Sequence, residues 1–179
     1  MRRPHSALVR LTGWATPTDT GVQLGSLNVT TPWRPEGASQ RVSLVAYPRT
    51  TSSGLITSLH ARPRLVRPAS GPNSETFEVT GQLIRVDRQR GAVRIKVSPA
   101  RARLEPFMLN LSATTAVFDQ LDPDAFAVMV TGRVLHLRGP SLLAECAQVV
   151  HAPVSPRWAG HRGKRGYGAA IALAQAAQP

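Results

Sequence analysis

Basic residues that could bind phosphate gather in one part of the chain. Between positions 85 and 103, seven Arg and Lys residues stand against one acid, Asp87. Guanidinium groups form forked hydrogen bonds with phosphate, so such a cluster can follow a nucleic-acid backbone without reading its sequence. A solvated strand face in an Arg-rich chain is the alternative interpretation. With one arginine from a later strand, the expected phosphate contacts are Arg85, Arg88, Arg90, Arg94, Lys96, Arg101, Arg103 and Arg133.

Aromatic side chains could add stacking to this phosphate binding. Each base that stacks on an aromatic ring contributes roughly 1 to 3 kcal/mol. Trp33 is the first choice, because Pro32 and Arg34 place it in a polar loop where a buried ring is less expected. The other stacking candidates are Trp14, Tyr47 and Phe107. The aromatic residues in apolar runs, which we expect in the core, are Phe77, Phe118 and Phe126.

Residues suited to catalysis or metal binding are scattered. The five His lack metal-ligand spacing, and the acids occur singly or in turns. No Walker-type phosphate loop, nucleophile elbow or dinucleotide fingerprint occurs. The single cysteine, Cys146, excludes an internal disulfide, and its apolar neighbours predict a small core residue. We therefore expect a protein without enzymatic activity, cofactor or metal.

The overall composition agrees with a polyanionic partner. A net charge of +12 attracts polyanions, nucleic acid first among them. However, 20 of the 22 basic residues are Arg, which a GC-rich genome would also produce, so charge alone leaves both explanations open. The start of the chain is basic and no long apolar segment follows it, so we expect no membrane span and a cytoplasmic, nucleoid-associated protein.

The second half of the chain has the pattern of five β-strands and one helix. The clearest strand alternates Val93, Ile95 and Val97 with two basic residues, which gives one apolar and one charged face. Gly81 inside the preceding strand predicts a bulge or sharp coil. Thr114 is positioned to cap a short helix with Val117, Phe118 and Leu121 on one side. The other strands are expected at 76–86, 107–111, 125–137 and 142–150.

The first half contains a degenerate copy of this pattern. Residues 11–13 and 21–24 echo residues 79–81 and 91–94 at similar spacing. Strands at 42–49 and 55–66, joined by a turn, parallel the last two strands of the second half. No third strand or helix is evident, and residues 30–40 are expected to form an irregular loop. A β extension packed on a single barrel is the alternative.

These patterns predict an all-β protein built from tandem small Greek-key barrels, the first of them degenerate. The expected regions are a degenerate barrel at 6–68, a linker at 69–75, a complete barrel with one short helix at 76–152, and a flexible basic tail rich in Gly, Pro and Ala at 153–179.

The segment 76–151 resembles the OB-folds of single-stranded DNA-binding proteins. The resemblance rests on Val79-Thr80-Gly81, the strand with Arg94 and Lys96, the helix near Phe118, and residues 130–133. It covers under half of the chain and implies the barrel better than the ligand. It implies sequence-tolerant binding of single strands in replication, recombination or repair. The chain departs from the bacterial members in ending on a basic rather than an acidic tail and in having fewer aromatic platforms.

The expected function is therefore non-enzymatic binding of single-stranded DNA, with the second barrel as the main module and the tail as an auxiliary arm. An RNA-binding or ribosome-associated role is the nearest alternative, because RNA rewards the same charge and stacking. A structural adaptor for an acidic protein partner is a third possibility. Small barrels also pair through strand edges, so a homo-oligomer stays open.

Overall fold

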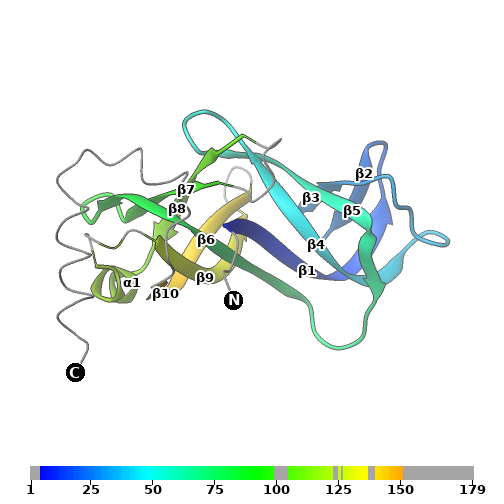
Figure 1. The fold of residues 1–179 in the computed structure, drawn as a ribbon. Helices are drawn as coiled ribbons and strands as arrows, with labels where there is room; N and C mark the ends of the chain where they lie inside the picture. The colour runs from blue at the N-terminus through cyan, green and yellow to red at the C-terminus, as the bar shows by residue number, and fades with distance from the viewer. Residues whose placement is uncertain (1–4, 99–104, 123–124, 126, 137–139, 151–179) are drawn as a thin grey trace, which may run out of the picture. The chain divides into compact units, whose positions relative to one another are not determined.

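The computed structural model describes residues 5–98, 105–122, 125, 127–136 and 140–150. Predicted features at Arg101, Arg103, Phe126 and the tail 153–179 lie outside these residues. The described part belongs to one compact unit and consists almost entirely of β-structure (Figure 1). Its elements are β1 (Ser6–Pro17), β2 (Gly21–Leu24), β3 (Leu27–Thr30), β4 (Gln40–Thr50), β5 (Ile56–Pro68), β6 (Ser74–Asp87), β7 (Ala92–Val97), β8 (Phe107–Ala113), α1 (Thr115–Gln120), β9 (Ala127–His136) and β10 (Pro140–Val149).

The second half of the chain closes into a five-stranded barrel. Its strands pair in the order β6, β7, β8, β10, β9, and β9 pairs again with β6 to complete the ring. All pairings are antiparallel except that of β8 with β10, where Leu143 pairs with Ser112. Helix α1 lies between β8 and β9 in the chain, and its Val117 and Phe118 are buried, as the sequence predicts. Thr114 is the N-cap residue, although its side chain makes no capping hydrogen bond.

The strands of the first half pair in the same circular order. The ring runs β1, β2, β3, β5, β4, and β4 pairs with β1. The parallel pairing again joins the third and fifth strands, β3 and β5. Here the sequence-based expectation was wrong, because a third strand exists at Leu27–Thr30. With four residues, this strand is too short to show a clear alternating pattern in the sequence. The loop from 31 to 39 is irregular, as expected.

One continuous sheet joins the two barrels. Strand β1 of the first barrel (β1–β5) pairs with β6 of the second barrel (β6–β10) over seven residue pairs, among them Val9 with Phe77 and Arg10 with Thr76. Val9 and Phe77 are both buried, so the two interiors lie on the same side of this sheet. The opposite side of β5, β4, β1, β6, β9 and β10 forms the outer face.

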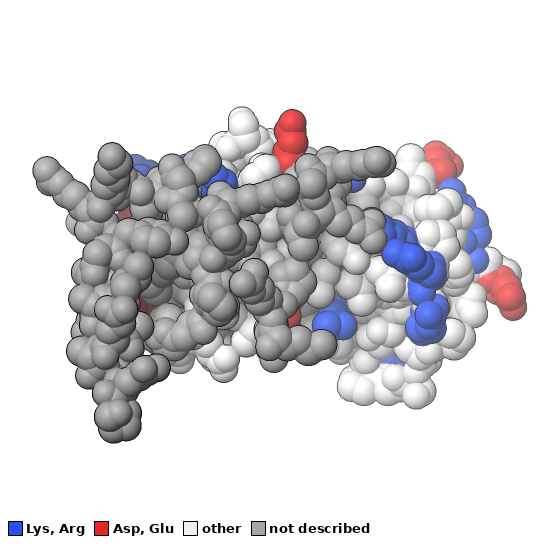
Figure 2. Space-filling model, in the orientation of Figure 1, with Lys and Arg blue, Asp and Glu red and all other residues white. Residues whose placement is uncertain are grey.

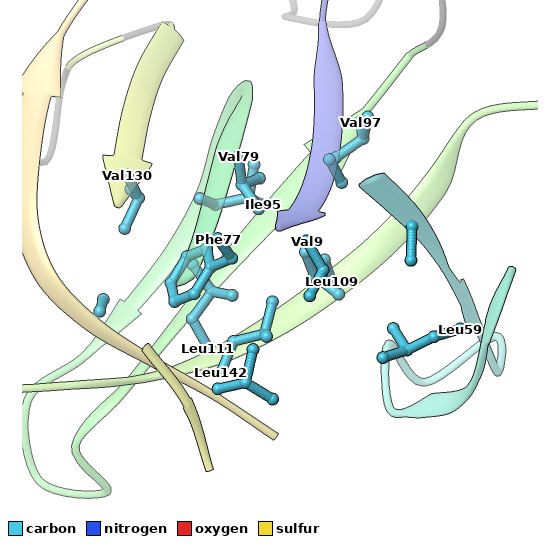
Figure 3. Packing of buried hydrophobic residues seen from close by; sticks show 14 of the residues in the cluster. Val9, Leu59, Phe77, Val79, Ile95, Val97, Leu109, Leu111, Val130 and Leu142 are labelled. Atoms are coloured by element: carbon cyan, nitrogen blue, oxygen red, sulfur yellow. The ribbon is translucent and has the colours of Figure 1, made fainter. Parts of the chain in front are cut away.

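The core follows from alternation along the strands. Inward-facing Val, Leu and Ile side chains of both barrels form one hydrophobic cluster, part of which Figure 3 shows. Ile95 and Leu109 are fully buried, and Phe77 is 3% exposed. Burial of each such side chain contributes about 1.5 to 3 kcal/mol relative to exposure. Phe77 and Phe118 therefore occupy the core positions that their apolar neighbours predict.

Two local expectations need correction. The β-bulge of β6 lies between Leu83 and Arg85, where Ile84 is the additional residue, so of the two alternatives for Gly81, a bulge or a sharp coil, the bulge is wrong. Gly81 is needed for another reason, since a Cβ atom there would lie 2.6 Å from the carbonyl oxygen of Lys96. Cys146 is only partly buried, because a bulge between Ala144 and Cys146 turns it out of the core. Among the described residues, no helix is long and apolar enough to cross a membrane.

Candidate nucleic-acid interface

The positive charge is divided unevenly between the barrels. Residues 6–68 contain seven Arg and two acids, whereas residues 69–150 contain nine basic and eight acidic residues. The first half therefore carries most of the excess charge within residues 6–150. This difference in charge is present in the sequence, although the densest local cluster of basic residues lies in the second half, near position 90.

Most of the predicted phosphate contacts in the second barrel have partners within the protein. Arg85 pairs with Asp87 at 2.9 Å, and Arg133 pairs with Glu145 at 2.6 Å. Arg88 donates to the carbonyl oxygen of Phe118 at 2.9 Å and lies 3.3 Å from a carboxylate oxygen of Asp119. Exposed pairs of this kind contribute little stability, about 0 to 1 kcal/mol, but each acid lowers the local positive potential. Arg90 is exposed, and Lys96 is partly exposed on β7.

Arg94 is held by a loop of the first barrel. One of its terminal guanidinium nitrogens donates to the carbonyl oxygen of Ser53 at 3.1 Å. Asn110, directly opposite Arg94 on β8, donates its side-chain amide to the same oxygen at 2.9 Å. The backbone N–H of Asn110 donates to the carbonyl oxygen of Gly54, also at 2.9 Å. The turn between β4 and β5 therefore covers part of the strand face on which the sequence predicts a groove.

The first barrel presents a different cationic surface on the outer face of β1, β4 and β5. Val9 and Leu11 of β1 point into the barrel, so their neighbours Arg10, Thr12 and Trp14 point out. Cross-strand pairs then bring outward residues together, for example Trp14 with Arg41. We call this surface the basic face, and its residues are Arg10, Trp14, Arg41, Tyr47, Arg49, His60, Arg62 and Arg67.

The cations of the basic face lack acidic partners. Among the described residues, no arginine of the first barrel forms an ion pair. Arg41 donates to the side chain of Asn73 at 3.1 Å, and Arg67 donates to the carbonyl oxygen of Val66 at 3.0 Å. Arg10 and Arg49 are exposed. Figure 2 shows basic side chains gathered over the part of the molecule that holds β1 to β5.

An aromatic ring lies among these cations. The guanidinium carbon of Arg62 is 5.8 Å from the ring centroid of Tyr47, and the Tyr47 side chain remains 37% exposed. His60 pairs with Tyr47 across the strands, and its ring bonds to the Ser58 hydroxyl at 3.0 Å. Burial, and secondarily the charge of Arg49, lowers the pKa of His60 below its usual value. The lowered pKa favours the neutral form of His60 beside the permanent positive charge of Arg49.

The two tryptophans of the first barrel differ in exposure. Trp14 is 57% exposed on β1, so its ring is free to stack on a base. Trp33 is partly buried and packs against the core. Arg34 fastens its loop by donating to the carbonyl oxygens of Thr31 at 2.7 Å and Asp19 at 3.2 Å. Phe107 also packs against the core, so Trp14 and Tyr47 are the most accessible of the four predicted stacking residues.

Within the described part of the chain, no group of three or more His, Cys, Asp or Glu is placed to hold a metal ion. Comparison with known proteins finds no matching family model, curated protein or solved structure. The geometry of the basic face is therefore the main guide to function.

Proposed function

We propose that the chain is a tandem OB-fold protein. Both rings of strands follow the order first, second, third, fifth, fourth, with the third and fifth strands parallel. The second ring also has its helix between the third and fourth strands. This arrangement supports the OB-fold in both halves, the first half differing by its short third strand and the loop at 31–39 in place of a helix.

We propose further that the protein binds single-stranded DNA with little sequence preference and without catalysis. The observation that carries this proposal is the basic face, where arginines without acidic partners lie beside two exposed aromatic rings, Arg62 beside Tyr47 and Arg41 opposite Trp14. Such a combination binds phosphates by charge and bases by stacking, and neither interaction depends on sequence. The charge distribution favours the first barrel as the stronger site. The second barrel contributes its remaining exposed cations, Arg90 and Lys96.

The same chemistry would serve RNA, and an acidic protein could also bind unpaired arginines. Exposed Trp, Tyr and Arg side chains also act as anchors at protein–protein interfaces, so direct binding measurements separate a nucleic acid from an acidic protein. DNA and RNA are separated by competition, since both present phosphates and bases.

Binding of the purified protein to a fluorescent 30-nucleotide single-stranded DNA across a salt series tests the proposal. For single strands, the logarithm of the affinity falls with the logarithm of salt concentration by about 0.7 per phosphate contacted. We expect steep salt dependence and weaker competition by duplex DNA than by unlabelled single strand. Stronger competition by RNA would redirect the proposal to RNA. Equal, weak competition by all polyanions would contradict it and favour a protein partner.

A further inference from the structure

The contact between the two barrels contains a site with the chemistry of a phosphate pocket. Arg94 and Asn110 are a directly opposed pair on β7 and β8, and both donate to one oxygen atom, the carbonyl oxygen of Ser53. An arginine and an amide that converge on a single oxygen suit a phosphate oxygen equally well. In this structure the oxygen comes from the protein's own backbone.

Arg94 has hydrogen-bonding capacity that the turn does not use. Its Nε atom is buried and has no hydrogen-bond partner among the described residues. A carbonyl group presents one oxygen, whereas a phosphate presents several and can accept from two nitrogens of the same guanidinium. Leaving a buried donor without a partner is unfavourable. The site is therefore better matched to a phosphate than to the carbonyl group that fills it.

The turn that fills the site is also connected to the basic face. Residues 51–55, the plug, join β4 to β5, and Arg49 and Tyr47 of the basic face lie just before them in the chain. A single DNA strand held on the basic face would thus bring its neighbouring phosphates close to the plug at high effective concentration. The bond from Arg94 to the Ser53 carbonyl has a charged donor but a neutral acceptor, whereas a phosphate is a charged acceptor, and this attraction between opposite charges favours exchange of the carbonyl for a phosphate.

Gly54 is the residue of the plug that packs closely against Asn110 of β8. It is buried with φ of +92°, and a Cβ atom there would lie 3.0 Å from the side-chain oxygen of Asn110. Gly37 has nearly the same φ, +89°, but a Cβ atom there would meet nothing within 4 Å. Alanine at either position strains the backbone, but only alanine at position 54 would also push the plug away from Asn110. Comparing the two variants therefore separates these two effects.

From these observations we infer that the plug covers a second phosphate-binding site, formed by Arg94 and Asn110. A single DNA strand bound to the basic face displaces the plug and so uncovers this site. This inference rests on the proposed function. It predicts a protein that holds a short strand with the first barrel alone and a longer strand with both barrels.

The test compares Gly54→Ala with the control Gly37→Ala in binding to a fluorescent 30-nucleotide oligo-deoxythymidine. We expect Gly54→Ala to bind several-fold more tightly than the unaltered protein, with a salt slope steeper by about 0.7 for the phosphate gained. Gly37→Ala should leave both unchanged. Adding Arg94→Gln to Gly54→Ala should abolish the gain.

A second measurement decides the matter even if Gly54→Ala fails to fold. The backbone N–H of Asn110, which donates to Gly54, should exchange its hydrogen faster in the unaltered protein when the oligonucleotide is saturating. If DNA binds without faster exchange at Asn110, or if Gly54→Ala gains no affinity, the plug stays bound to β8 in the complex. That result would overturn the inference and leave the proposed function intact. Failure of the unaltered protein to bind would reject both.

Discussion

At the scale of single residues, the arginines divide by what they contact. Among the described residues of the second barrel, three of the five arginines form ion pairs with acids: Arg85 with Asp87, Arg88 with Asp119 and Arg133 with Glu145. Those of the basic face contact carbonyl groups, a ring or solvent. Since an arginine with an acidic partner must give up that ion pair to bind a phosphate, the two groups should respond differently to charge reversal.

We expect Arg62→Glu to weaken binding to single-stranded DNA and to lower the salt slope by about 0.7, because one phosphate contact is lost, while the added negative charge weakens binding further. Arg85→Glu is the matched control, since Arg85 is already paired with Asp87. Fluorescence anisotropy at several salt concentrations measures both effects. A larger loss in Arg85→Glu than in Arg62→Glu would place the main site on the second barrel.

Tyr47 tests the stacking contribution separately from charge. Tyr47→Ala should cost roughly 1 to 3 kcal/mol of binding free energy, whereas Tyr47→Phe keeps the ring and should bind nearly as well as the unaltered protein. The comparison uses the same titration at one salt concentration. Equal losses in the two variants would assign the effect to the hydroxyl group and contradict stacking.

His5 links stability to pH. Burial lowers the pKa of its imidazole to about 4, although a backbone hydrogen bond at Lys96 partly opposes this shift. In the unfolded chain the imidazole of His5 has its ordinary pKa of 6.5. Between pH 6.5 and 4 this group therefore binds a proton in the unfolded chain that it does not bind in the folded protein. The free energy of unfolding should therefore fall as the pH drops through this window. Urea denaturation at pH 7.5, 6 and 5 measures the slope.

His5→Gln is the control for this pH dependence. It should flatten the slope, and the remainder should have the same sign, because the pKa of His60 is also lowered. An unchanged slope in His5→Gln would show that other groups cause the loss of stability in acid.

At the scale of elements, the first strands of the two barrels show how one motif can carry different constraints. Gly13 of β1 and Gly81 of β6 occupy matching places in the sequence echo. A Cβ atom at Gly81 would lie 2.5 Å from the Ile95 side chain, whereas at Gly13 the nearest atom would be 3.6 Å away. Only the second barrel closes tightly enough at this point to require glycine.

Gly81→Ala should therefore destabilise the protein by about 1 to 3 kcal/mol, the usual cost of overpacking a core. Gly13→Ala should change stability by less than about 0.5 kcal/mol, because the added methyl group makes only ordinary contacts. Urea denaturation of both variants at pH 7.5 compares them directly. Similar destabilisation by both would mean that the strand conformation, and not the close approach, demands glycine.

At the scale of the whole molecule, the barrels share a sheet and a core. The pairing of β1 with β6 continues the ladder from one barrel into the other, and the 51–55 turn bonds to β8. His136 of β9 is hydrogen-bonded to Ser26 of the first barrel and to Glu75 of β6. Loss of either barrel would expose the apolar surface that it shares with the other.

We accordingly expect a single cooperative unfolding transition. Leu44→Ala in the first barrel and Leu109→Ala in the second each remove a fully buried side chain and should cost about 2 to 5 kcal/mol. Both should shift the same transition, whether it is followed by circular dichroism or by the fluorescence of the tryptophans in the first barrel. Two separate transitions, each sensitive to one variant, would instead show that residues 6–68 and 76–150 fold independently.

The sequence by itself determined most of the β-strands, the helix and the similarity between the first strands of the two halves. Alternation such as Val93, Ile95 and Val97 is a local property, and the echo of residues 11–13 in 79–81 placed the first strand of each barrel correctly. The third strand of the first barrel could not be found this way, because four residues make a strand only when β2 and β5 flank them.

Only the tertiary structure decided which charges are free. Arg88 meets Asp119 and Arg94 meets Ser53 across long stretches of chain, and no local pattern reveals such partners. The same holds for the basic face, whose members are separated in sequence and are brought together by the register of β1, β4 and β5. A charge is available for binding when folding leaves it without a partner, and folding assigns partners at long range.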